Sequence, residues 1–145
     1  MKSMSAAAFG LYALSCLAAG AAAAASPEGI WLSHDGGTKV RITDCGGRLC
    51  GTVVWLHHPT DPATGAPKTD KHNPDPGKRA QPLIGLAIMH GLAPSGPNQW
   101  SGAIYNADDG HVYQAHLTIE GAGTARVEGC VLGVLCKGNV WTRAE

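Results

Sequence analysis

Hydrophobic and polar residues alternate along most of the chain beyond residue 28, and a period of two residues is typical of half-buried β-strands. None of these segments has the period of an amphipathic helix. The links between them are mostly short and contain glycine, aspartate or asparagine, which form turns readily. The pattern predicts eight short strands, at residues 28–34, 38–44, 48–57, 83–92, 99–106, 112–120, 124–131 and 135–143.

Eight strands joined edge to edge in sequence order most economically close into an up-and-down barrel, because closure removes the exposed sheet edges. The predicted fold class is therefore all-β, with a two-sheet sandwich as the alternative. The segment 83–92 is apolar at nearly every position, which predicts a strand covered on both faces. The side chains predicted to point inward, which are enough to fill so small a barrel, are Trp55, Trp100, Ile104, Tyr113, Leu117, Ile119, Val127 and Val140.

One long connection interrupts this pattern. Residues 58–82 contain six of the nine prolines, and proline lacks the N–H that a central strand needs. A loop of this length in a small domain is usually a lid, a binding loop or a disordered segment. We expect it to be ordered, to lie against one barrel end and to carry the function. Four of its side chains can hydrogen-bond one another, including an arginine–carboxylate pair, or face a partner: Asp70, Asn73, Asp75 and Arg79.

The first 25 residues have the composition of a secretory signal peptide. Lys2 is followed by the apolar stretch 6–17 and an alanine run, which predicts Sec-type export with cleavage after Ala25. The apolar stretch is too short to span a bilayer, and no second one is long enough, so we do not expect an integral membrane protein. Lipidation at Cys16 is less favoured, because Ala13 stands where lipoproteins prefer leucine. We expect one barrel domain, residues 26–145, in the periplasm or secreted.

Removing residues 1–25 from the 145-residue chain leaves 120 residues, four cysteines and a net charge of −1, since Lys2 is lost from eleven basic and eleven acidic residues. An even number of cysteines in an exported chain predicts disulfides. Of three connectivities we favour Cys45–Cys50 and Cys130–Cys136, because each pair flanks a glycine-containing turn. Their spacing does not suit zinc. The absence of a basic patch argues against binding to nucleic acid or electrostatic binding to membranes.

The two ends of this domain resemble a lipocalin motif. Gly29-Ile30-Trp31 opens it and Trp141-Thr142-Arg143 closes it, and the G-x-W resembles the lipocalin entry motif. In lipocalins that tryptophan closes one barrel end and a late arginine packs across it. The resemblance implies a structural clasp in which Arg143 stacks on Trp31.

A wider resemblance covers nearly all of residues 26–145. The chain is similar to the bacterial domain-of-unknown-function 2147 family, which implies an exported protein with a small lipocalin-like (calycin-like) barrel and no established activity. Many members carry arginine where this chain has Gln81, so a second cationic contact is not expected there. The matching residues are 29–31, Cys45 with 49–51 and 54–56, 61–65, Asp70, 73–75, Arg79, 82–86, 100–102, 104–106, Gly129-Cys130, Leu135-Cys136 and 141–143.

Motifs for chemistry are weak. The seven histidines include no H-x-H or H-E-x-x-H spacing, and adjacent His57 and His58, at a strand end, should point to opposite faces. No G-x-S-x-G motif surrounds a serine, and Asp61, Asp70 and Asp75 lack the spacing of a calcium loop. We therefore predict no catalytic residues, no metal and no cofactor.

The leading hypothesis is an exported, non-enzymatic barrel that binds a small apolar or amphipathic ligand or an envelope component. Barrel mouths are a recurrent ligand site. The alternatives are a structural or interaction module of the cell envelope with a filled barrel, and a hydrolase that uses the loop carboxylates. The candidate ligand or loop residues are Asp70, Asn73, Asp75, Arg79, Trp55, Trp100 and Tyr113.

Overall fold

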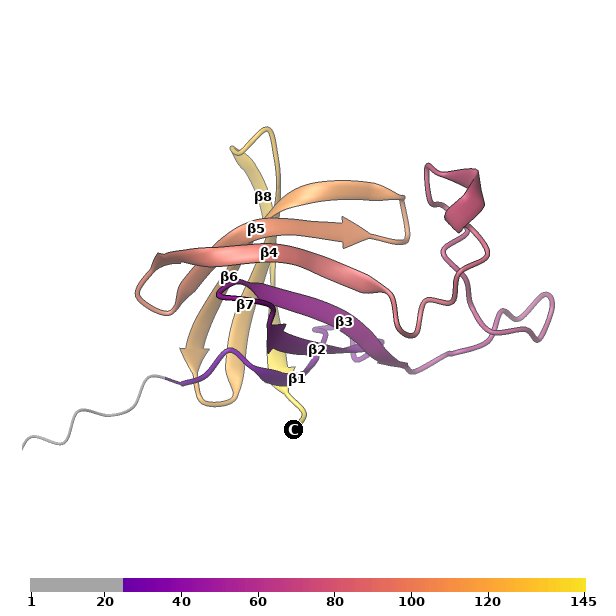
Figure 1. The fold of residues 1–145 in the computed structure, drawn as a ribbon. Coiled ribbons are helices and arrows are strands. Elements are labelled where there is room, and N and C mark those ends of the chain that lie inside the picture. The colour runs from indigo at the N-terminus through magenta and orange to yellow at the C-terminus, as the bar shows by residue number, and fades with distance from the viewer. Residues whose placement is uncertain (1–24) are drawn as a thin grey trace, which may run out of the picture.

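The computed structural model describes residues 25–145, which form a closed antiparallel barrel of eight strands (Figure 1). Each strand pairs with the next along the chain, and β8 returns to pair with β1. The predicted barrel is thereby confirmed over the two-sheet sandwich. Residues 1–24 of the predicted signal peptide, which include Cys16, lie outside the described residues. The strands are β1 (Gly29–Leu32), β2 (Thr38–Asp44), β3 (Leu49–Leu56), β4 (Ala87–Gly96), β5 (Gln99–Asn106), β6 (His111–Gly121), β7 (Thr124–Val131) and β8 (Leu135–Arg143).

The up-and-down order places alternate connections at opposite barrel ends. The β1–β2, β3–β4, β5–β6 and β7–β8 connections share one end, which we call the open end. The β2–β3, β4–β5 and β6–β7 turns share the other, which we call the closed end, where the chain also finishes (Figure 1). The β3–β4 connection is the long proline-rich loop, and it contains one short 3₁₀ helix, η1 (Pro76–Lys78).

The hydrophobic core occupies the middle and closed end of the barrel. Trp31 and Leu117 are completely buried, and Ile119 and Val127 are buried as predicted. Trp100 is half-buried and packs against this cluster. The core residues are Trp31, Val40, Ile42, Leu49, Met89, Leu92, Leu117, Ile119, Ala125, Val127 and Trp141.

Trp55 was predicted to point inward, and this is wrong. Lys39 pairs with Trp55 while the next residue, Val40, pairs with Val53, so Val54 is an extra residue in β3. Such a bulge shifts every following side chain to the other face. Val53 is therefore buried, and Trp55 lies on the outer wall, where the Lys39 Nζ atom is 5.3 Å from its ring centroid.

Val140 was also predicted to point inward, and it too lies outside. On β8 the inward positions are Lys137, Asn139 and Trp141, all of which line the barrel interior, while Val140 is exposed. The prediction assumed that the hydrophobic residues of this strand point inward. It failed because β8 lines the open cavity here, where polar side chains can face the interior.

The fourth strand begins later than predicted and is not covered on both faces. Residues 83–86 belong to the long loop, and Ile84 is 47% exposed. The strand instead continues past its predicted end at Leu92 to Gly96. Gly91 has φ 57° and sits at a register shift, so Met89 and Leu92, three residues apart, both point into the core.

Candidate functional site

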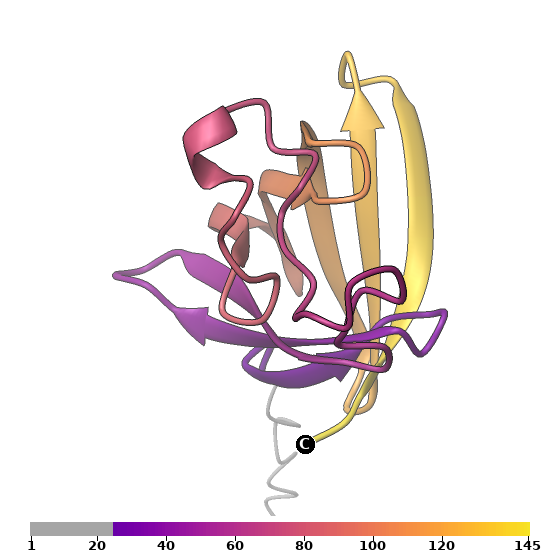
Figure 2. The same cartoon turned by 90° about the vertical axis from the view of Figure 1, so that its right-hand side faces the viewer.

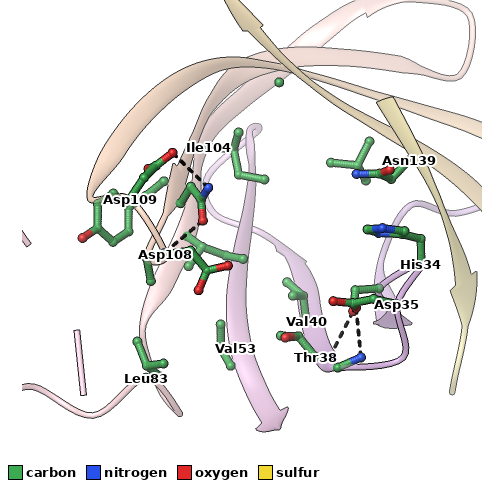
Figure 3. A pocket seen from close by; sticks show the side chains of 18 of the residues that line it. His34, Asp35, Thr38, Val40, Val53, Leu83, Ile104, Asp108, Asp109 and Asn139 are labelled. Carbon is green, nitrogen blue, oxygen red and sulfur yellow. Dashed lines mark hydrogen bonds between the residues drawn. The ribbon is translucent and has the colours of Figure 1, made fainter. Parts of the chain in front are cut away.

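A cavity of about 810 Å³ opens at the end of the barrel that carries the long loop. Its walls are apolar where they meet the core. Figure 3 shows Val40, Val53 and Ile104 lining the space between β2, β3 and β5. The barrel is therefore filled at the closed end and hollow at the open end. The apolar lining comprises Val40, Val53, Leu56, Leu83, Leu86, Ile88, Ile104, Val127, Val131, Leu135 and Trp141.

The mouth of the cavity is polar and carries charges of both signs. His34 and Asn139 lie on one side and Asp108 and Asp109 on the other (Figure 3). A ligand seated here meets aliphatic side chains below and ionic or hydrogen-bonding groups above. The polar and charged side chains of the mouth are Ser33, His34, Asp35, Thr38, His57, His58, Lys68, Asn106, Asp108, Asp109, Tyr113, Lys137 and Asn139.

Hydrogen bonds fix two of the carboxylates at the mouth. Asp35 accepts from Ser33 Oγ at 2.5 Å and from the Gly37 N–H at 2.9 Å, and chiefly the serine bond lowers its pKa. Asp109 accepts from Tyr113 Oη at 2.6 Å, which lowers the pKa of the carboxyl and raises that of the phenol. These carboxylates are therefore ionised near neutral pH. Tyr113, a candidate ligand residue, lines the cavity with its hydroxyl engaged.

The loop side chain Asp70 is completely buried. Its Oδ1 accepts from Tyr105 Oη at 2.7 Å, and its Oδ2 accepts from Asn73 Nδ2 at 2.7 Å and Gln81 Nε2 at 3.2 Å. Burial, and then the bond to Asp70, raises the pKa of Tyr105 to about 12. Three neutral donors thus hold one carboxylate: Asn73 and Gln81 bind it within the loop, and the Tyr105 hydroxyl attaches the loop to β5.

Asp75 and Arg79 stabilise the loop itself. Asp75 Oδ1 caps η1 by accepting from the Gly77 N–H, and Arg79 Nε donates to the Asn73 carbonyl oxygen at 2.8 Å. The predicted arginine–carboxylate pair is therefore wrong, since the guanidinium binds backbone. Sequence reasoning missed Tyr105 and the anchoring role of Gln81.

Backbone contacts bind the rest of the loop to the open end. Val53 N–H donates to the Leu86 carbonyl oxygen and Gly85 N–H to the Val53 carbonyl oxygen, at 2.9 and 2.8 Å. At the β5–β6 turn, a side chain on Gly110 would overlap the His72 carbonyl. Figure 2 shows the loop lying across this end of the molecule. Lys68, Leu83 and Leu86 of the loop complete the cavity wall.

The two ends of the domain meet at the closed end of the barrel. Trp31 pairs with Arg143 across β1 and β8, and the guanidinium carbon lies 4.3 Å from the indole centroid. The same guanidinium donates to the carbonyl oxygens of Ser26, Glu28 and Ala122. Arg143 thereby ties the segment before β1 and the β6–β7 turn to the barrel end.

The histidines do not all lie as expected. His57 and His58 were predicted to point to opposite faces, but their ring centroids are 4.5 Å apart and both side chains lie at the cavity mouth. The strand alternation no longer applies to them because β3 ends at Leu56. On the outer wall, Ser101 Oγ donates to Ser95 Oγ and lies 2.8 Å from His116 Nδ1. This trio is not among the residues that line the cavity.

The two predicted disulfides are present. Cys45 is bonded to Cys50 beside the β2–β3 turn, and Cys130 to Cys136 across the β7–β8 hairpin. Both bonds are consistent with an extracytoplasmic protein. Among residues 25–145 there is no helix with the length and hydropathy of a membrane span.

Two comparisons with known proteins gave matches. A model of a family described as "Uncharacterized protein conserved in bacteria (DUF2147)" matches residues 29–143. The structure is similar to that of HP1028 from Helicobacter pylori, described as belonging to the lipocalin family, with a TM-score of 0.71 and 20% sequence identity over 83% of this chain and 84% of that one. The comparison with curated proteins gave no match. The likeness to HP1028 shows a shared fold.

Proposed function

The chain belongs to the bacterial DUF2147 family, and we propose that it is an exported, non-enzymatic protein that binds a small amphipathic ligand inside its barrel. The observation that carries this proposal is the cavity of about 810 Å³ with an apolar floor and a polar mouth. Pockets of this size and composition are typical of small-molecule sites.

The cavity suits an elongated ligand with one polar end. Aliphatic side chains and Trp141 surround the deeper part, where a polar group without a partner would be costly to bury. At the mouth, Lys68 and Lys137 supply cations and Asn139 supplies an amide. Asp108 and Asp109 also lie at this mouth, so the ligand that fits this arrangement has a hydrocarbon body and a polar head group.

Export is supported by the composition of residues 1–25 and by the two disulfides, which persist in oxidising compartments. The interaction-module alternative assumed a filled barrel, and the open cavity counts against it. The hydrolase alternative is disfavoured because the loop carboxylates are engaged in structure. Asp61 and Asp75 cap turns of the loop, and Asp70 anchors it.

Titration with a dansyl-labelled fatty acid tests the proposal, with fluorescence as the readout. Ile104→Trp places a larger side chain in the cavity, and we expect it to weaken binding at least about tenfold. The control is Ala103→Trp, the adjacent residue of β5, whose side chain lies on the other face of the strand and should leave binding unchanged.

Native mass spectrometry of protein purified from its own periplasm would identify the natural ligand. Saturable binding that both variants retain equally would place the site outside the barrel. No binding of any amphiphile to the wild-type protein, together with a mass free of any co-purifying molecule, would reject the proposal.

A further inference from the structure

The tip of the β7–β8 hairpin is the most exposed apolar part of residues 25–145. Val131, Leu132, Val134 and Leu135 are 47%, 89%, 77% and 70% exposed. The hairpin projects from the barrel at the open end (Figure 1 and Figure 2). From Cys130 to Cys136 the chain has no charged residue, and the disulfide between these two cysteines closes the hairpin below the tip. We call residues 131–135 the apolar tip.

The backbone conformation of the turn is also unfavourable for its leucine, Leu132. Leu132 has φ 55° and Gly133 has φ 68°, so both central residues of the turn are left-handed. Asn-Gly is the favoured sequence for such a turn, and a leucine there is unfavourable because its Cβ crowds the backbone. A small polar residue would suit both the backbone and the solvent. The position carries instead the most exposed leucine of the described chain, which points to a role outside the fold.

We propose that the apolar tip inserts into the surface of a lipid bilayer. Stable protein interfaces bury roughly 800 Å² on each partner, from about twenty residues or more, whereas this tip consists of five. A convex group of aliphatic side chains needs no shaped partner to leave water at the boundary between head groups and acyl chains. The cross-linked hairpin presents the four side chains together, without ordering a flexible segment on binding.

The insertion is driven by apolar burial and not by charge. The tip itself is neutral, and the first charged residue after it, Lys137, lines the cavity, whose mouth also carries Asp108 and Asp109. With cations and anions together at this end, we expect binding to depend little on salt or on anionic lipid. Four aliphatic side chains give weak, reversible attachment.

This attachment would bring the cavity to the membrane. Val131 and Leu135 belong both to the tip and to the cavity lining, so an inserted tip places the mouth at the lipid surface. An amphipathic ligand could then pass between bilayer and barrel along apolar side chains. This consequence rests on the proposed function, whereas the insertion itself does not.

The experiment measures co-sedimentation of residues 26–145 with vesicles of pure phosphatidylcholine, and of phosphatidylethanolamine with phosphatidylglycerol. We expect the double variant Leu132→Asn, Val134→Asn to lose binding to both by about tenfold or more. Because asparagine suits the turn, Leu132→Asn alone should keep the melting temperature or raise it. The control is Val140→Asn, an exposed aliphatic on the outer wall of the same hairpin, which should bind like the wild type.

Three results would overturn the proposal. The first is equal sedimentation of the double variant and the wild type. The second is binding that disappears in high salt or on phosphatidylcholine, which would indicate electrostatic attachment. The third is a dimer, detected by light scattering, that the double variant converts to a monomer. Titration with soluble dansyl fatty acid separates the two hypotheses, since the double variant should retain the cavity and bind this probe as the wild type does.

Discussion

At the residue scale, Arg143 combines two roles in one side chain. It covers the Trp31 ring and donates to three backbone carbonyls from two segments far apart in sequence. We predict that Arg143→Ala lowers the free energy of unfolding by about 1–2 kcal/mol. Trp31→Ala should cost about 3–5 kcal/mol, since it leaves a large void in the core. Urea denaturation measures both.

Arg126 provides the matched control for this prediction. Its Nε donates to Glu120 Oε1 at 2.8 Å on the outer wall, and such surface pairs contribute at most about 1 kcal/mol. Arg126→Ala should therefore shift the denaturation midpoint less than Arg143→Ala. An unchanged midpoint in Arg143→Ala would mean that the clasp between the two chain ends does not stabilise the barrel.

Ionisation of Tyr105 should lower the free energy of unfolding at alkaline pH. Its pKa is raised from 10.0 to about 12 in the folded protein, chiefly by burial. Between these values the unfolded chain releases the proton and the folded chain retains it, so stability is complete below pH 10 and falls as the pH rises to about 12. We predict that Tyr105→Phe removes this part of the alkaline loss while lowering stability at neutral pH. Chemical denaturation of both proteins from pH 8 to 12 measures the difference, and parallel curves would contradict it.

At the scale of the element, one carboxylate fixes the proline-rich loop. Removing Asp70 leaves the Tyr105 hydroxyl and the Asn73 and Gln81 amides without their buried acceptor. We predict that Asp70→Ala speeds hydrogen exchange throughout residues 60–82 with little change in the barrel strands. Asp61→Ala is the control, because this half-buried side chain caps the Ala63 N–H within the loop. Equal exchange in the two variants would show that the loop is held by its backbone contacts alone.

The same scale shows what the sequence could and could not predict. The alternation of hydrophobic and polar residues predicted the first and last residues of four strands as the structure has them: β2, β5, β7 and β8. Alternation fails where one residue is added to a strand. The bulge at Val54 sends Trp55 outward, and the one near Gly91 buries Met89 and Leu92 together. Nothing local marks Val54 as the extra residue, since only pairing with β2 defines it.

Only part of the candidate site could be predicted, because some of its contacts join residues that are far apart in the sequence. The polar residues of the loop were identifiable because they stand out in a proline-rich segment. Their buried partner Tyr105, which is 35 residues away from Asp70, was not. Hollow barrel space is equally invisible in a pattern of hydrophobic residues. Val140 and Asn139 are neighbours, and only the closed structure shows that the polar residue faces the interior.

At the scale of the whole molecule, the barrel should fold without the loop that covers its open end. The β-ladders close the barrel through pairing of neighbouring strands and of β8 with β1, and the core residues all lie outside the loop. Replacing residues 60–78 by a few glycines and serines removes Asp70 and Lys68 but exposes Tyr105 to water, where its hydroxyl finds new partners. We therefore expect a folded barrel with a modestly lower melting temperature.

We expect the shortened loop to weaken ligand binding more than it lowers the stability of the barrel. The loop supplies Lys68 to the mouth and positions Leu83 and Leu86 in the wall, so its loss opens one side of the cavity to solvent. Affinity differences between related complexes arise mostly in dissociation, and we predict a dansyl fatty acid that leaves the shortened protein about tenfold faster. Stopped-flow displacement measures this rate, with Ala103→Trp as the control that keeps the loop. If the shortened barrel folds and releases the probe at the wild-type rate, the loop is not part of the binding site, and the ligand is held by the barrel wall alone.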